Sequence, residues 1–212
     1  CVLASDSDSI VSRSIEEFEY HADMARWMGY GKQFQDFKIN VHIAGRQGPE
    51  GIRKVLGKLS PEARNTITIE NEENAWGLDD CLSIADIVPI VMDVHHHWCR
   101  EGEYLDPNSD RARLVRDSWR GVRPTMHYSI SREDWLPGHD VNTLPNYSTL
   151  LAEGKKKQKL RAHSDFYWNT ACNEWVLGFL DNFDIMCESK GKNLSSFNLY
   201  RQWKNGMDNN SQ

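Results

Sequence analysis

The sequence lacks several features that would each place it in a class of protein. It has no apolar run long enough to span a bilayer, so we expect no membrane segment. It has no internal repeat and no low-complexity tract beyond GKKKQK. It also has no CxxC motif, and an odd number of scattered cysteines argues against a disulfide framework and favours a reducing compartment. The five cysteines are Cys1, Cys81, Cys99, Cys172 and Cys187.

An excess of positive charge is also absent. The chain has 25 Lys and Arg against 31 Asp and Glu, which gives a net charge of -6 with histidine neutral. This balance argues against a nonspecific DNA-binding protein with a uniformly basic surface. It is compatible with a local basic face, or with divalent cations held by acidic side chains. The 212 residues are enough for one domain with a core, or for part of a larger domain.

The sequence does contain a regular alternation of helix-like and strand-like segments. The strand-like segments are 37–45, 65–74, 88–97, 123–131 and 183–190, and the helix-like segments are 8–29, 49–60, 77–87, 106–121, 173–182 and 194–203. This alternation predicts a parallel α/β fold, in which functional side chains lie at the C-terminal ends of the strands. We interpret residues 131–161 as a long functional loop and residues 206–212 as a flexible tail.

A histidine or a carboxylate stands at the end of every strand-like segment. Taken singly, such a residue is explained by a packed histidine or by the first solvated loop residue. Five together favour a convergent metal site, because imidazole nitrogen and carboxylate oxygen bind Zn²⁺ or Mn²⁺. The five residues are His42, Glu70, Asp93, His127 and Glu188, and His95 and His96 follow Asp93 closely.

The reaction is not fixed by these residues alone. A set of three carboxylates and one histidine carries more negative charge than one divalent ion cancels, which favours a bridging carboxylate and a second ion. Such clusters activate water and hold a phosphate during displacement. Metal-dependent sugar isomerases on the same kind of barrel use similar residues. The residues therefore predict a metal site and leave a nuclease and a sugar-binding enzyme as alternatives.

Five runs of sequence, in order, resemble the UV damage endonuclease family. They are ITIENEEN, VMDVHHHWC, PTMHYSISRE, RAHSDFYWN and FDIMCESKGKN, and SIEEFEYHADMARWMGYGK followed by INVHIAG fits as well. The resemblance covers Cys1 to about Trp203. It implies a TIM barrel related to endonuclease IV that nicks DNA on the 5′ side of UV photoproducts with a cluster of divalent metals.

The resemblance also implies ligand sets for up to three ions. One ion is held by Glu70, Asp93, His127 and Glu188, a second by His42 with Glu70, and a third by His96 with His163. Glu70, Asp93 and Glu188 are the expected catalytic residues, with Glu70 as a bridging carboxylate. We expect Mn²⁺, with Zn²⁺, Mg²⁺ and Co²⁺ as alternatives. His95 and His97 are expected to orient the metal ligands or to pack in the core, and their side chains point away from His96 if the chain stays extended there. The spacing of three from Asp93 to His96 breaks the alternation of a strand, so we expect the chain to turn after Asp93.

The sequence departs from the family pattern at its start, at position 125 and in the length of one insert. A full barrel has eight strands and this sequence has five, so we expect a single partial domain, 1–212, that comprises about the last five βα units. A further metal-binding histidine of the family, in an HPxQ-type motif, is expected before Cys1. Many members have a carboxylated lysine two residues before the histidine at position 127, where this chain has Thr125, and the 131–160 insert is longer than expected.

The expected partner is damaged double-stranded DNA, bound by a monomeric cytoplasmic protein of bacterial or viral origin. Phosphate contacts are expected from basic side chains, although a solvated loop also explains the densest basic run. These side chains are Arg132, Lys155, Lys156, Lys157, Lys159, Arg161 and Lys190. A noncatalytic remnant that binds damaged DNA is the remaining alternative.

Overall fold

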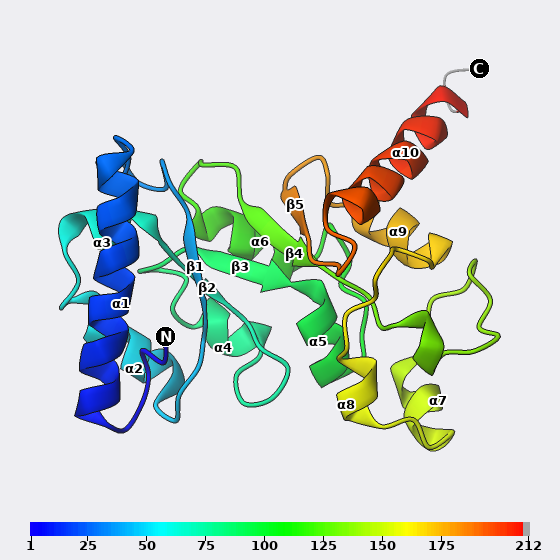
Figure 1. The fold of residues 1–212 in the computed structure, drawn as a ribbon, viewed down its shortest axis with the longest axis horizontal. Helices are drawn as coiled ribbons and strands as arrows, with labels where there is room; N and C mark the ends of the chain where they lie inside the picture. The colour runs from blue at the N-terminus through cyan, green and yellow to red at the C-terminus, as the bar shows by residue number, and fades with distance from the viewer. Residues whose placement is uncertain (210–212) are drawn as a thin grey trace. The chain divides into compact units, whose positions relative to one another are not determined.

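The computed structural model describes residues 1–209. The chain forms two compact units: the first comprises Cys1–Met92 and Asn108–Pro124, and the second comprises Asp93–Pro107 and the chain from Thr125 onward. Helices and strands alternate along both units (Figure 1). No helix within the described residues is both long and apolar enough to cross a membrane.

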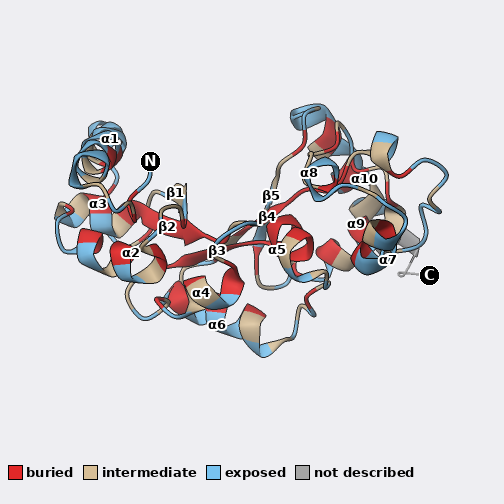
Figure 2. Cartoon of the chain, turned by 90° about the horizontal axis from the view of Figure 1, so that it is seen from below, coloured by how far each residue is buried: buried red, intermediate tan, exposed pale blue. Residues whose placement is uncertain are grey.

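The first unit is built on three parallel strands. Its elements are α1 (Asp8–Trp27), β1 (Ile39–His42), α2 (Gly48–Leu56), α3 (Pro61–Thr66), β2 (Ile67–Glu70), α4 (Leu78–Leu82), β3 (Ile90–Asp93, whose last residue belongs to the second unit) and α6 (Asp110–Ser118). β1 pairs with β2 from Ile39↔Ile67 to His42↔Glu70. Every residue of β2 and β3 is buried, as Figure 2 shows, because strands covered on both faces exclude water from each side chain.

The second unit is built on one parallel strand pair. Its elements are α5 (Val94–Glu101), β4 (Thr125–Tyr128), η1 (Glu133–Trp135), α7 (Tyr147–Ala152), α8 (Lys157–Leu160), α9 (Thr170–Leu177), β5 (Asp184–Cys187) and α10 (Asn193–Asn209). β4 pairs with β5 from Thr125↔Asp184 to Tyr128↔Cys187. The predicted parallel α/β fold is therefore present in both units.

The histidine run is helical, whereas the sequence suggested that a strand continued to residue 97. β3 ends at Asp93 and α5 begins at the next residue. The Asp93 side chain accepts a hydrogen bond of 2.7 Å from the backbone N–H of His96, which is the usual role of an aspartate before a helix. The turn after Asp93 is confirmed, and the extended arrangement of His95 and His97 is wrong.

The segment 131–161 is not an open loop. It contains η1, α7 and α8, and its apolar side chains form a buried cluster with α5. The buried members of the cluster are Trp98, Cys99, Leu136, Tyr147, Leu150 and Leu160. Burial of this many apolar side chains outweighs the entropy of a free loop.

The C-terminal helix is longer than the sequence suggested. α10 continues to Asn209, so residues 206–209 of the expected flexible tail are helical. Residues 210–212 lie outside the described part of the chain.

Candidate metal centre

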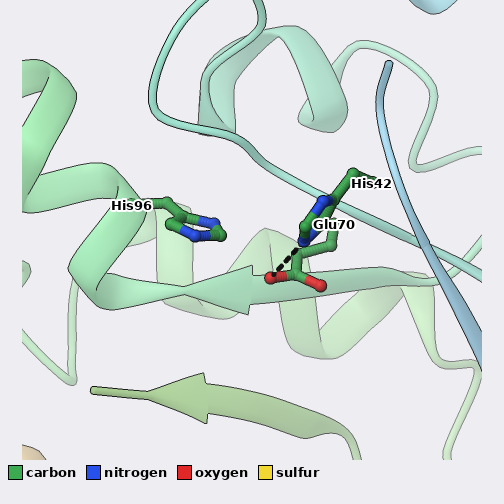
Figure 3. A group of neighbouring side chains, drawn as sticks. All are labelled: His42, Glu70 and His96. Atoms are coloured by element: carbon green, nitrogen blue, oxygen red, sulfur yellow. Dashed lines mark ion pairs between the residues drawn. The ribbon is translucent and has the colours of Figure 1, made fainter. Parts of the chain in front are cut away.

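In the first unit, the strand register places His42 beside Glu70. The two residues are direct partners in the parallel β1–β2 pair. His42 Nε2 lies 3.3 Å from Glu70 Oε1, an ion pair drawn as a dashed line in Figure 3. Glu70 is 1% exposed, while the His42 side chain is 55% exposed. A buried carboxylate with an accessible imidazole offers one oxygen and one nitrogen ligand.

Two further polar side chains hold Glu70 from the same strand pair. The Asn40 side-chain amide donates a hydrogen bond to Glu70 Oε2. The hydroxyl of Thr68 donates to Asn40 Oδ1 at 2.9 Å. Residues two apart on a strand share a face, so Asn40 with His42, and Thr68 with Glu70, point the same way. Because Oδ1 is occupied by a donor, the NH₂ group of Asn40 faces the carboxylate. Sequence reasoning missed both residues.

In the second unit, three predicted ligands converge. Asp93, His127 and Glu188 each offer one ligand atom, and these atoms lie within 4.8 Å of one another. His127 Nδ1 is 3.2 Å from Glu188 Oε1. Two carboxylates and one imidazole at this spacing fit the ligand chemistry of Zn²⁺ or Mn²⁺. These buried or half-buried groups are therefore able to hold a metal ion.

Strand ends position these three side chains. Asp93 is the last residue of β3, and His127 lies near the end of β4. Glu188 follows β5 directly, and its backbone N–H donates to Tyr128 O at 2.8 Å, which extends the β4–β5 pairing by one step. Thr125 lies two residues before His127 at the start of β4 and is half-buried. The side chains thus meet where parallel strands present their C-terminal ends.

His96 and His163 lie near each other in the second unit. Their ring centroids are 6.4 Å apart, and His96 Nδ1 is 3.7 Å from Asp93 Oδ2. His163 is fixed by an isolated antiparallel bridge to Ser131. His96, drawn in Figure 3, comes from the first turn of α5. The structure thus brings together the two histidines that the family resemblance paired.

The other two histidines of the run are buried. The pKa of His95 is lowered to about 3, chiefly by burial and also by the nearby His163 and His96 rings. Its ring stacks on Trp98 with centroids 5.8 Å apart. His97 Nε2 lies 2.8 Å from Glu103 Oε1. These contacts agree with the expected packing and orienting roles.

The predicted basic residues differ in their surroundings. Arg132 is engaged by two carboxylates: its Nη2 lies 2.9 Å from Asp134 Oδ2, and its Nη1 lies 3.4 Å from Asp165 Oδ1. Lys159 lies over the Trp135 ring, 4.1 Å from its centroid. In the run from 155 to 161, Lys156 and Lys157 are exposed, whereas Lys155 and Arg161 are half-buried.

An open groove of about 530 Å³ lies beside Glu188 in the second unit. It is lined by Ala162, His163, Met186, Cys187, Glu188, Ser189, Lys190 and Lys192. The predicted phosphate-contacting Lys190 therefore shares a groove with two predicted metal ligands. Lys192 is a groove residue that sequence reasoning did not select.

Comparison with known proteins gives one consistent result. A sequence model of the family described as UV-endonuclease UvdE matches residues 1–211. The UV-damage endonuclease of Schizosaccharomyces pombe is 24% identical over 95% of this chain and 32% of its own length. The UV DNA damage endonuclease of Bacillus mycoides is 25% identical over 93% of this chain and 57% of its own length. The UV DNA damage endonuclease of a Nostoc species is 26% identical over 79% of this chain and 56% of its own length.

A solved structure shows the same fold. The crystal structure of SacUVDE matches with a TM-score of 0.72 and 26% identity, covering 96% of this chain and 62% of the SacUVDE chain. This chain therefore spans less than two thirds of the length of the relatives that it matches.

Proposed function

Since the chain belongs to the UvdE family of UV-endonucleases, we propose that it acts in DNA repair as a metal-dependent endonuclease that nicks DNA on the 5′ side of UV photoproducts. The family resemblance and the TIM-barrel type of α/β fold predicted from the sequence are confirmed. The family match also favours a nuclease over the sugar isomerase alternative.

The observation that carries the proposal is the convergence of Asp93, His127 and Glu188 within 4.8 Å. We propose the ligand sets implied by the resemblance: these three with Glu70, then His42 with Glu70, and His96 with His163. These residues would hold divalent ions, for which we propose Mn²⁺, and an ion bound there would supply Lewis-acid polarisation of the phosphodiester and activation of water. The protein's part is to hold the ligands in place and to orient the scissile phosphate.

The proposed role of Glu70 as a shared carboxylate is supported by how its two oxygens are used. Oε1 faces His42 and Oε2 accepts from Asn40. With both oxygens directed by neighbours, the carboxylate cannot rotate freely, which suits a bridging ligand. One oxygen of Asp93 is also held, because Oδ1 accepts a hydrogen bond from the backbone N–H of His96. We propose that Asp93 and Glu188 orient the attacking water.

The proposed substrate is double-stranded DNA with a distorted site. A photoproduct weakens stacking, so extruding the damaged dinucleotide costs less than extruding normal bases. We propose that backbone phosphates contact Lys190 in the groove and the basic run from 155 to 161. Arg132 is the weaker candidate, because two carboxylates already neutralise it.

A nicking assay on UV-irradiated and undamaged duplexes tests the proposal. The full protein is assayed with Mn²⁺ and again after chelation, beside Glu188→Gln and the matched control Glu174→Gln on the exposed surface of α9. We expect metal-dependent cuts 5′ to the photoproduct in the wild type and the control, and none in Glu188→Gln. Absence of cuts by folded wild-type protein that binds Mn²⁺ in calorimetry would contradict the endonuclease proposal.

A further inference from the structure

The turn that follows Glu188 brings two lysines into the groove. We call residues Ser189–Lys192 the lysine turn. Ser189 is buried, while Lys190 and Lys192 are exposed, and all three line the groove that also contains His163 and Glu188. Within the described part of the chain, no ion pair includes Lys190 or Lys192. The groove therefore offers two unneutralised ammonium groups beside a predicted metal ligand.

Hydrogen bonds fix the lysine turn to the loop that carries His163. The backbone N–H of Lys190 donates to Ser164 O at 3.1 Å, and that of Gly191 donates to Asp165 O at 2.9 Å. The Ser195 hydroxyl donates to the same Asp165 carbonyl at 2.5 Å. The two lysines therefore have a backbone held in place relative to His163 as well as Glu188.

This attachment depends on the absence of a side chain at Gly191. A Cβ atom there would lie 2.2 Å from Ser195 Oγ and 2.5 Å from Asp165 O. Both distances are far shorter than van der Waals contact, and the carbonyl belongs to the backbone. A larger residue would push the turn away from the His163 loop.

Lys192 has an unusual backbone conformation for its residue type. Its φ is +52°, in the left-handed region that favours glycine and, less strongly, asparagine. A strained residue of this kind persists only where its surroundings hold it, and such residues gather at functional sites. Glycine would relieve the strain but would carry no charge. The lysine at this position thus points to a use for its ammonium group.

We propose that the lysine turn is a binding subsite for phosphate groups of the DNA backbone, with Lys192 as a contact residue alongside Lys190. The inference rests on the proposed function, which supplies DNA as the substrate. The chemistry of the groove favours it, because two exposed ammonium groups that no carboxylate pairs with in the described part of the chain attract the negative charge of a phosphate. Ammonium groups act as point charges toward phosphate and need no defined base sequence.

The test is the salt dependence of DNA binding by the full protein. Affinity for a labelled UV-irradiated duplex is measured by fluorescence anisotropy, with a chelator present to prevent cleavage. The variants are Lys192→Asn and Lys192→Gly, which both suit a positive φ, and the control Lys32→Asn, which removes one exposed lysine outside the groove.

We expect both Lys192 variants to bind about three- to tenfold more weakly at 0.1 M salt, and the slope of log K against log salt to fall by about 0.9. Lys32→Asn should leave the slope unchanged. Lys192→Gly should melt at an equal or higher temperature than the wild type, by up to about 4 °C, because the strain is relieved. Loss of affinity without loss of stability excludes a merely structural role.

Unchanged salt slopes in both Lys192 variants, with a wild type that binds the duplex, would overturn the subsite and leave the proposed function standing. If the Lys192 variants lower the salt slope as expected but the wild type does not nick the UV-irradiated duplex, the subsite is supported and the endonuclease proposal is overturned. A wild type that does not bind the duplex would overturn the subsite, and the nicking assay with Mn²⁺ decides the endonuclease proposal separately.

Discussion

Asn40 donates its side-chain amide to one oxygen of Glu70 across the β1–β2 pair. Thr68 fixes the other end of that amide, and His42 faces the second oxygen of Glu70. The orientation of this buried carboxylate is therefore set before any ion binds. Support of this kind around a metal ligand commonly changes metal affinity by about 10- to 100-fold.

We expect Asn40→Ala to weaken Mn²⁺ binding by at least about tenfold, because Glu70 loses its donor and gains freedom to rotate. Thr68→Val should cost less, since the Asn40 amide keeps its place but is able to flip. Calorimetric titration of the full protein with Mn²⁺ measures both. Asn198→Ala, on the exposed surface of α10, is the control. Equal affinities in Asn40→Ala and the control would rule out this role.

Substitutions at Asp93 should separate its two roles. Asp93 caps α5 through the His96 N–H and offers a carboxylate ligand. Asparagine still caps a helix, so Asp93→Asn should lose metal affinity with little change in stability. Asp93→Ala should lose metal affinity and also about 1 kcal/mol of the free energy of unfolding. Urea unfolding of both variants in the presence of a chelator gives the difference, and identical unfolding curves would argue against the cap.

Neutralising Arg132 and Lys190 should have unequal effects on DNA binding. Arg132 is 26% exposed and paired with Asp134 and Asp165, whereas Lys190 is exposed in the groove. Lys190→Gln should lower the salt slope of DNA binding by about 0.9, and Arg132→Gln should lower it by much less. A larger effect from Arg132→Gln would mean that its ion pairs open when DNA binds.

The thiols should differ in reactivity, since the thiolate is the reactive form. Burial raises the pKa of Cys172 to about 12, and burial also raises the pKa of Cys81. At pH 8 both thiols remain almost fully protonated in the folded protein, and their thiolate fraction becomes appreciable only at much higher pH. We expect iodoacetamide at pH 8 to label half-buried Cys187, which lines the groove, before Cys81 and Cys172. Peptide mass mapping that finds Cys81 labelled as fast as Cys187 would contradict this packing.

The sequence predicted the strand-end residues because parallel strands place such residues at one edge by geometry alone. His42, Glu70 and Asp93 are the last residues of their strands, His127 is the last but one of β4, and Glu188 directly follows β5. Asn40 and Thr68 were missed because a polar residue inside a short strand is usually interpreted as an exposed position. The alternation of side chains along a strand could have identified them, since each lies two residues before a predicted ligand and therefore on the same face of the sheet.

Other features depended on contacts that a local pattern does not contain. α5 was not predicted because its eight residues include three histidines, and its cap, Asp93, also ends an apolar strand. α3 was missed because six residues give no periodicity, although Ser60 and Pro61 are a typical helix start. The His163 position came only from the family resemblance, because a loop histidine has no strand end to place it.

The apolar cluster that residues 131–161 form with α5 determines where the chain tolerates a change in length. The cluster anchors α7 and α8 to α5, while Ala152, the last residue of α7, and the turn residues Glu153 and Gly154 are exposed. Surface tips of this kind accept insertions and deletions with little cost, since no buried contact is lost. Length can therefore vary at this tip while Ser131 still holds His163 and the strand ends keep their side chains in place. A fluorescent protein or an affinity peptide inserted after Glu153 should leave metal binding intact.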